Sequence, residues 1–158
     1  MTRPILCCFD IDGTLSAKMD QYDESLNNLL SLRPHPNSIR IVMAALTLDN
    51  AEVMFCTGRS KGAYGATWRW LNRHLGIAHL GKRVTLVCRP PETPLDAIPQ
   101  YKLSEVVQAI RRQPEKLAEL RCYDDSVQNL RLMQTLRPMV DKLRLYRVED
   151  GVATAWAL

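Results

Sequence analysis

The stretch Phe9-Asp10-Ile11-Asp12-Gly13-Thr14-Leu15 places two carboxylates one residue apart, directly after an apolar run and directly before a glycine. The run itself, residues 5–9, is short and continuously apolar, which is typical of a strand buried on both faces of a parallel sheet. Asp10 and Asp12 would then emerge at the carboxyl end of that strand, where alternate residues point to the same side. Open α/β sheets bind their ligands at this edge.

Two neighbouring carboxylates of this kind suit Mg²⁺, which is usually bound through one or two carboxylates together with substrate phosphate. An Asp in such a position can also act as a covalent nucleophile and form an aspartyl-phosphate. Gly13 allows the sharp turn that follows, and Thr14 adds a hydroxyl. An alternative interpretation is a simple turn, because Asp and Gly are both common turn residues.

The composition indicates one globular domain over residues 1–158. Of the 158 residues, 46% are hydrophobic, which is enough for a single substantial core. No apolar run approaches the length of about 18 residues needed for a membrane span, and the first strand begins too near Met1 for a signal peptide. We therefore expect a cytoplasmic protein without membrane contact. The net charge of +4 is compatible with a polyanionic substrate but is also ordinary for a soluble protein.

The five cysteines lie in segments with the composition of core strands, and they show no C-x-x-C pair or other zinc-binding spacing. We expect buried thiols that act as small apolar residues, as suits a reducing compartment. The residues are Cys7, Cys8, Cys56, Cys88 and Cys122.

Strand-like and helix-like segments alternate along the rest of the chain. Strands are expected at residues 52–56, 83–88, 120–123 and 143–148, the last at the edge of the sheet. Helices are expected from about residue 37, at 64–75, from Lys102, briefly from Pro114, and after Ser126. Residues 16–38 are expected to form a small flap, too short for a cap domain. The alternation predicts an α/β fold with a doubly wound, Rossmann-like parallel sheet of five strands, helices on both faces and a minimal cap.

Polar groups of complementary kinds follow four of these segments. They are Asp10 with Asp12, then Thr57, then Lys102, then Asp124 with Asp125. Each has a plainer explanation when taken alone: Thr57 can begin a turn, Lys102 can be a solvated helix residue, and Asp124 can belong to a helix cap. The ordered set is a more specific signal than any one member.

This ordered set resembles the four motifs of the haloacid dehalogenase superfamily of phosphotransferases, which are D-x-D-G-T, a Ser or Thr, a Lys and an acidic pair. The first motif matches at every position, residues 10–14. Thr57-Gly58-Arg59, the loop at Arg89 and the absence of a large cap look most like the 3′-phosphatase domains of bacteriophage polynucleotide kinase/phosphatases. The chain departs from those proteins in lacking the G-x-x-x-x-G-K-[ST] phosphate loop of a kinase half, and its segment after Arg59 looks shorter.

The resemblance implies a Mg²⁺-dependent phosphomonoesterase. Asp10 would attack the phosphorus atom, and Asp12 would protonate the leaving hydroxyl and later activate water. Mg²⁺ would be bound by the Asp10 carboxylate, the Asp12 backbone carbonyl and an acidic side chain of Asp124 or Asp125, with Asp125 favoured.

The resemblance also implies how the substrate would be bound. Thr57 would donate a hydrogen bond to a phosphoryl oxygen, and Lys102 would offset the negative charge around it. Arg59 and Arg89 are substrate-binding candidates because arginine binds phosphate in a bidentate manner, and the set is completed by Gly58 and Thr14. On a nucleic acid end, a basic path of Lys61, Arg69 and Arg73 would bind flanking phosphates, and Trp70 or His74 would stack a base, unless the tryptophan packs on the sheet.

Three functions stay open. The favoured one is a polynucleotide 3′-phosphatase in nucleic-acid end repair, because a site with little cap admits a polymer. The second is a phosphatase of nucleotides or other small phosphate esters. The third is a binding module that keeps the fold without turnover, which is less favoured because Asp10, Asp12 and the acidic pair are all present. Neither the oligomeric state nor a preference for DNA or RNA follows from the sequence.

Overall fold

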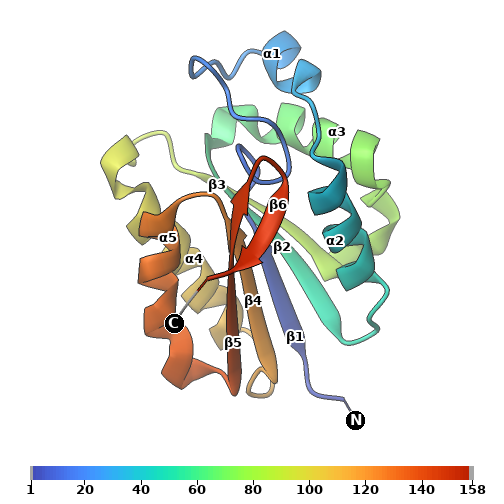
Figure 1. Ribbon diagram of the computed structural model, residues 1–158, viewed down its shortest axis with the longest axis vertical. Coiled ribbons are helices and arrows are strands. Elements are labelled where there is room, and N and C mark those ends of the chain that lie inside the picture. Colours follow the sequence, from blue (N-terminus) through green and yellow to red (C-terminus); the bar gives the residue numbers. More distant parts are fainter. Residues whose placement is uncertain (1, 157–158) are drawn as a thin grey trace.

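The computed structural model describes residues 2–156, whose six strands form one sheet in the order β3-β2-β1-β4-β5-β6 (Figure 1). Neighbouring strands pair in parallel except β6, which runs antiparallel to β5. The strands are β1 (Ile5–Phe9), β2 (Ala51–Ser60), β3 (Val84–Arg89), β4 (Glu119–Asp124), β5 (Lys142–Glu149) and β6 (Val152–Ala155). The α/β class is confirmed, and the predicted count of five strands was wrong.

The additional strand forms a hairpin with β5. Asp150 and Gly151 connect the two strands and have φ values of 48° and 78°, the pair of left-handed residues found in a two-residue type I′ turn. β6 itself is four residues long and mostly exposed, so it has no hydrophobic period to reveal it. β5 is therefore not the edge strand that its alternating pattern predicted.

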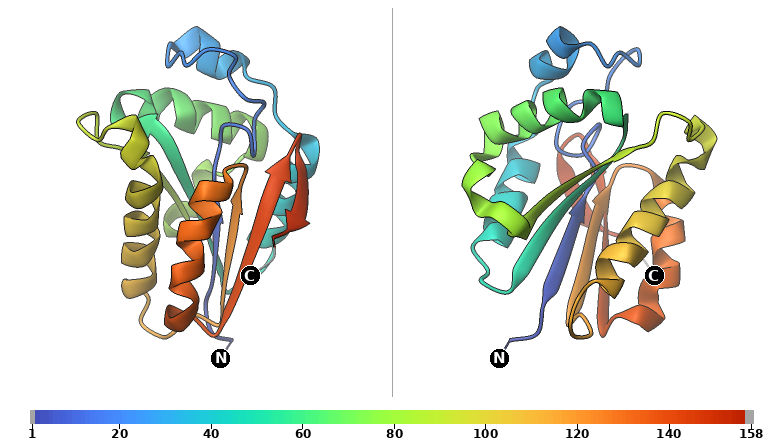
Figure 2. Two further views of the ribbon diagram at one scale, coloured as in Figure 1. Left: turned by 60° about the vertical axis from the view of Figure 1, so that its left-hand side comes forward. Right: turned by 180° about the vertical axis from the view of Figure 1, so that it is seen from behind.

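Helices cover both faces of the sheet (Figures 1 and 2). The helices are α1 (Leu26–Ser31), α2 (Pro36–Leu46), α3 (Tyr64–Leu75), α4 (Ile98–Arg111) and α5 (Val127–Met133), with 3-10 helices η1 (Lys61–Ala63), η2 (Ala78–Arg83), η3 (Leu95–Ala97) and η4 (Gln134–Met139). One core cluster joins α2 and α3 to Cys7 and Phe9 of β1, and a second joins α4 and α5 to Leu6 and Cys8. β1 is thus buried on both faces, as its continuous apolar run predicts.

The helix bounds differ from the predicted ones in informative ways. α3 covers the predicted residues 64–75. α4 begins at Ile98, so Lys102 lies one turn inside the helix rather than at its start. α2 begins at Pro36, which occupies the first turn where the missing N–H of proline costs nothing. The short helix expected from Pro114 is not formed, and residues 113–115 form a bend instead.

A flap lies over the carboxyl edge of the sheet and carries α1 (Figure 1, upper blue segment). Its base is closed by a bridge between Ser16 and Pro34 and by a hydrogen bond of 2.8 Å from the Ala17 N–H to the Arg33 carbonyl. The indole N–H of the buried Trp70 donates to the Leu32 carbonyl at 2.8 Å. The flap is therefore closed at its base and attached to α3.

All five cysteines are free thiols and are buried, as expected, in strands β1 to β4. None of the helices within residues 2–156 is long and apolar enough to cross a membrane.

Candidate active site

Three carboxylates meet at the carboxyl edge of the sheet. Asp10 directly follows β1, and its backbone N–H donates to the Tyr123 carbonyl of β4 at 3.0 Å. Each of Asp10, Asp124 and Asp125 offers a carboxylate oxygen within 4.8 Å of the other two. Gly13, at φ 82°, makes this possible, because a Cβ there would lie 2.5 Å from Asp125 Oδ2. The sequence therefore predicted correctly that the D-x-D-G turn and the acidic pair lie together.

Lys102 is buried between two of these carboxylates. Its Nζ lies 2.6 Å from Asp10 Oδ1 and 3.0 Å from Asp124 Oδ2, and its side chain is 4% exposed. Thr14 donates its hydroxyl to the other Asp10 oxygen at 3.1 Å. Asn129 of α5 donates its amide to Asp124 at 3.0 Å. Asp10 is thus bound on both oxygens, by an ammonium on one and a hydroxyl on the other.

The charges in this cluster favour the protonated, positively charged form of Lys102. Burial raises the pKa of Asp10, and the Asp124 and Asp125 carboxylates add to the effect while Lys102 opposes it. Burial alone would lower the pKa of Lys102, but the Asp10 and Asp124 carboxylates outweigh it and hold that pKa well above its ordinary value. We therefore place the proton on Lys102.

The oxygen donors of Asp10, Asp124 and Asp125 fit a hard divalent cation such as Mg²⁺. The ammonium groups that contact this trio come from Lys102 and from Lys18, whose Nζ lies 3.0 Å from Asp125 Oδ2. Within residues 2–156, two ammonium groups thus contact three carboxylates. The cluster therefore carries an excess of negative charge. A bound metal ion would neutralise this charge, which would otherwise repel a phosphate group.

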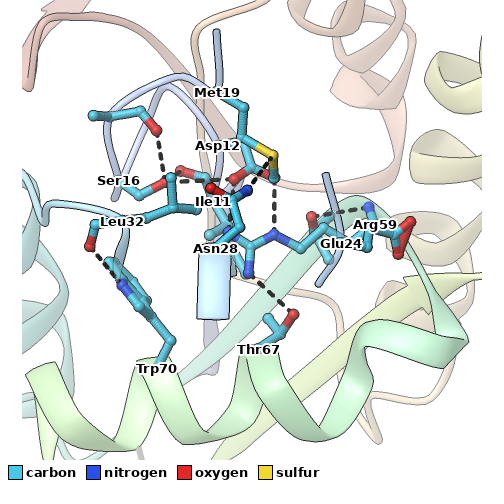
Figure 3. A network of polar contacts seen from close by, with 12 residues as sticks. Ile11, Asp12, Ser16, Met19, Glu24, Asn28, Leu32, Arg59, Thr67 and Trp70 are labelled. Carbon is cyan, nitrogen blue, oxygen red and sulfur yellow. Dashed lines mark hydrogen bonds and ion pairs between the residues drawn. The ribbon is translucent and has the colours of Figure 1, made fainter. Parts of the chain in front are cut away.

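Asp12 is paired with Arg59 instead of with a lysine (Figure 3). Arg59 Nη2 lies 2.6 Å from Asp12 Oδ1 and Nε lies 2.9 Å from Oδ2, which is a bidentate ion pair. The Arg59 side chain is 0% exposed, and its Nη1 donates to the Thr67 hydroxyl of α3 at 3.1 Å. The plane of the Asp12 carboxylate is therefore fixed from two elements, β2 and α3.

A bulge in β2 positions Arg59. β2 continues to Ser60, four residues past the predicted strand end, and its register against β3 shifts between Thr57 and Ser60. Gly58 and Arg59 are the extra residues, and a bulge of this kind redirects a side chain. A Cβ at Gly58 would lie 3.0 Å from the Ile98 side chain, so the bulge packs closely against α4.

Two predicted substrate contacts lie elsewhere. Thr57 is 0% exposed, and its hydroxyl oxygen accepts the Arg59 backbone N–H at 3.2 Å. Arg89 is buried, and its guanidinium donates to backbone carbonyls, at 2.7 Å to Gly58 and 2.8 Å to Thr93. Neither residue lines the cavity described next. Arg89 instead ties the bulge of β2 to the loop that follows β3.

A cavity of about 270 Å³ opens above the carboxylates. Of the predicted site residues, it brings together Asp10, Asp12, Gly58, Arg59, Lys102 and Asp125. Thr14 and Asp124 do not line the cavity. Thr14 is hydrogen-bonded to Asp10, and Asp124 is hydrogen-bonded to Lys102. The cavity is also lined by residues that the sequence did not single out: Lys18, Met19, Tyr22, Ile98 and Asn129. The only available signal for Lys18, Met19 and Tyr22 was their place in the flap, a few residues after D-x-D-G-T.

Of the residues predicted to contact nucleic acid, the tryptophan is buried and the cations are exposed. Trp70 is 0% exposed, so its packing on the core excludes the proposed base stacking. The His74 ring packs against it, with centroids 4.6 Å apart. Lys61, Arg69 and Arg73 are exposed on η1 and α3, where a basic path would require them.

No protein-family model matches this chain, and no curated protein matches it. Its fold is similar to a chain in the structure of the Pnkp1/Rnl/Hen1 complex, with 16% identity, a TM-score of 0.66, and coverage of 96% of this chain and 48% of that one. A chain in the structure of the Pnkp1/Rnl/Hen1 RNA repair complex shows 17% identity, a TM-score of 0.67 and coverage of 94% and 44%. DsGPDH of Dunaliella salina shows 19% identity, a TM-score of 0.53 and coverage of 87% and 23%.

This chain thus spans about half the length, or less, of each of these three solved chains. At these identities the likeness extends to the fold.

Proposed function

We propose that this chain is a Mg²⁺-dependent phosphomonoesterase of the haloacid dehalogenase type that removes 3′-phosphates from nucleic-acid ends. The observation that carries the proposal is the placement of Asp10, paired with Lys102, beside Asp12 in one cavity at the carboxyl edge of the sheet. A buried carboxylate held by an ammonium is available as a nucleophile, and a second carboxylate nearby is available for proton transfer.

In the proposed reaction an Asp10 oxygen attacks the phosphorus atom, and the bond from phosphorus to the ester oxygen breaks. Asp12 gives its proton to the departing oxygen, which leaves as a hydroxyl. Water then attacks the aspartyl-phosphate, Asp12 takes a proton from that water, and phosphate departs with Asp10 restored. Arg59 occupies one lone pair on each Asp12 oxygen, and a carboxylate has about four, so Asp12 retains a site for the proton.

Mg²⁺ would be bound by Asp10, by Asp124 or Asp125, and, as the resemblance implies, by the Asp12 carbonyl. When bound, it would stabilise the negative charge of the transferring phosphoryl group. Lys102 would keep Asp10 ionised, and Asn129 would orient Asp124 through their hydrogen bond of 3.0 Å. We assign Arg59 a positioning role on Asp12 rather than a contact to substrate phosphate, because both of its pairing edges are occupied.

The choice of a nucleic-acid substrate is supported by the similarity of the fold to a chain of an RNA repair complex and by the exposed cations of α3. A cavity of about 270 Å³ also fits a mononucleotide, so hydrolysis of nucleotides or other small phosphate esters is the second candidate.

Phosphate release tests the proposal. The substrates are a 3′-phosphorylated oligonucleotide, the same oligonucleotide with a 5′-phosphate, and a nucleoside 3′-monophosphate, each with Mg²⁺ or EDTA. We expect Mg²⁺-dependent release from the 3′ end that Asp10→Asn abolishes. Asp49→Asn is the matched control, since Asp49 is exposed in the turn between α2 and β2.

Release from the mononucleotide alone would favour the second candidate. Absence of release from every substrate, including a generic phosphate ester, would favour a binding module that keeps the fold without turnover.

A further inference from the structure

Three of the residues that line the cavity carry large, mostly apolar side chains, which we call its apolar wall. Met19 and Tyr22 of the flap form it together with Ile98, the first residue of α4. This apolar wall belongs to the same cavity as Asp10 and Asp12, so the organic part of an ester whose phosphoryl group is bound at Asp10 would share that cavity with these three side chains.

Tyr22 is held in place by its hydroxyl while its ring stays open to the solvent. The hydroxyl donates to Glu24 Oε2 at 2.6 Å, and the residue is 55% exposed. Glu24 Oε1 in turn accepts the Ser60 N–H at 2.9 Å and the Ser60 hydroxyl at 2.6 Å, directly after Arg59 in β2. Burial and the Glu24 hydrogen bond raise the pKa of Tyr22 to about 12, so the hydroxyl remains a neutral donor. The ring is thus fixed at its polar end, and its apolar part is left for a ligand.

The charges around the cavity indicate what kind of leaving group fits this wall. Within residues 2–156 the cations lining the cavity are Lys18, Arg59 and Lys102, and each is paired with an aspartate at 3.0 Å or less. A second phosphate on the same ligand would find no unpaired cation among them. The cavity volume of about 270 Å³ lies just below the usual range of about 300 to 1,000 Å³ for small-molecule sites, which leaves room for one nucleotide unit.

We propose that the Tyr22 ring is the specificity-determining surface of this site and that it stacks on the base of the nucleotide whose phosphate is bound at Asp10. The inference rests on the proposed phosphatase function and narrows its substrate class to phosphate esters of nucleosides. Aromatic side chains stack on any base, since every base has a π face, so this wall would accept different bases. Esters without an aromatic ring, such as sugar or glycerol phosphates, have no π face to stack on it.

Kinetics of three variants test this assignment. In Tyr22→Ala, KM for a nucleoside 3′-monophosphate should rise roughly 5- to 150-fold, which corresponds to the loss of one base-stacking contact. The kcat should stay unchanged, because the contact is the same in the ground state and the transition state. Turnover of glycerol 2-phosphate should not respond to the substitution. Tyr64→Ala, which removes a tyrosine of similar exposure outside the cavity, should leave both substrates unaffected.

Tyr22→Phe separates stacking from a structural role. It keeps the ring and removes the hydrogen bond to Glu24, so stacking predicts a KM close to that of the unmodified protein. A value close to that of Tyr22→Ala would instead assign the effect to the hydrogen bond and overturn the inference.

Binding without turnover separates failure of this inference from failure of the proposed function. In an Asp10→Asn background, calorimetry should show that Tyr22→Ala weakens binding of the nucleoside 3′-monophosphate by the same factor. Equal affinity with and without the ring would overturn the inference even if the protein hydrolyses phosphate esters. If Tyr22→Ala weakens binding but the unmodified protein releases no phosphate, the base contact would be supported and the proposed phosphatase function rejected.

Discussion

Lys102 illustrates how one residue determines both the charge state and the stability of the site. Replacing it with Met would leave Asp10 and Asp124, which are 7% and 10% exposed, without their ammonium partner. We expect the free energy of unfolding to fall by about 3–5 kcal/mol, the usual cost of breaking a buried ion pair. Urea denaturation with EDTA measures this loss, and Mg²⁺ should restore part of it by supplying positive charge to the carboxylates.

Lys116→Met is the matched control for this measurement. Lys116 pairs with Asp141 at 3.0 Å, but its side chain is 53% exposed. Exposed pairs contribute little, so the control should lose less than about 1 kcal/mol. Equal effects of the two substitutions would contradict a buried, charged Lys102.

At the scale of residues, the sequence predicted that the carboxylates and Lys102 lie together, but it did not predict the partners of the arginines. The acidic residues directly follow strands, and an apolar run in the sequence predicts where each strand ends. The pairing of Arg59 with Asp12 joins residues 47 positions apart and depends on a bulge that no hydrophobic period reveals. For the same reason Arg89 was predicted to contact substrate, whereas its guanidinium donates to carbonyls of the β2 bulge and of the loop after β3.

At the scale of elements, the β5–β6 hairpin is held close to the start of α2. A Cβ at Gly151 would lie 2.8 Å from the Cβ of His35, whereas a Cβ at Gly76, after α3, would meet nothing within 4 Å. Both glycines have positive φ, so each Gly→Ala substitution costs about 1–2 kcal/mol in backbone energy. Gly151→Ala should cost more than Gly76→Ala because of the additional clash. Denaturation midpoints of the two variants compare these costs. Equal losses of stability would show that the hairpin moves away from His35 without cost.

The flap is joined to β2 by a carboxylate whose effect depends on pH. Burial opposes ionisation of Glu24, but its hydrogen bonds from Ser60 and Tyr22 outweigh burial and hold its pKa below the ordinary value of 4.5. The folded pKa is thus lower than the unfolded one, so the stabilisation is complete above about pH 4.5 and disappears as the pH falls through the folded pKa.

Glu24→Gln should therefore be less stable than the unmodified protein near pH 7, and the difference should shrink as the pH falls below 4.5 and through the lowered pKa of folded Glu24. Chemical denaturation at a series of pH values measures it. Glu92→Gln, at an exposed position in the loop after β3, should show no such dependence. A difference that stays constant with pH would argue against an ionised Glu24 in the folded protein.

The elements that could be predicted are those whose local pattern agrees with their packing. α3 has a hydrophobic period, and β1 has an apolar run, and both appear where expected. Near Pro114 the proline favoured a helix start, but only a few residues separate the end of α4 from β4, and they form the connection. β6 carried one signal, the Asp150-Gly151 pair, which is a strong hairpin marker that the weak pattern of the following residues obscured.

At the scale of the whole molecule, the distribution of exposed cations distinguishes a polymer substrate from a small one. Lys61 and Arg69 are exposed on η1 and α3. If they bind phosphates of a single strand, the double variant Lys61→Ala/Arg69→Ala should lower the slope of log affinity against log salt by about 1.4, which is 0.7 for each contact. The KM for a mononucleotide should not change.

Binding of a 3′-phosphorylated oligonucleotide to the Asp10→Asn protein at several salt concentrations measures that slope. Arg137→Ala/Lys142→Ala removes the same charge near the amino-terminal end of β5, at the opposite edge of the sheet, and should leave the slope unchanged. Equal slopes for both double variants would argue against a nucleic-acid path along α3.

The five buried thiols have a consequence for how opening of the sheet can be followed in time. They lie in four strands that are adjacent in the sheet, β3, β2, β1 and β4. Burial raises the pKa of both Cys7 and Cys88 to about 11, so these thiols are protonated as well as inaccessible in the folded protein. A thiol reagent can therefore react with each cysteine only while its strand is out of the sheet. The order in which the five are labelled would give the sequence in which neighbouring strands separate, without any introduced probe.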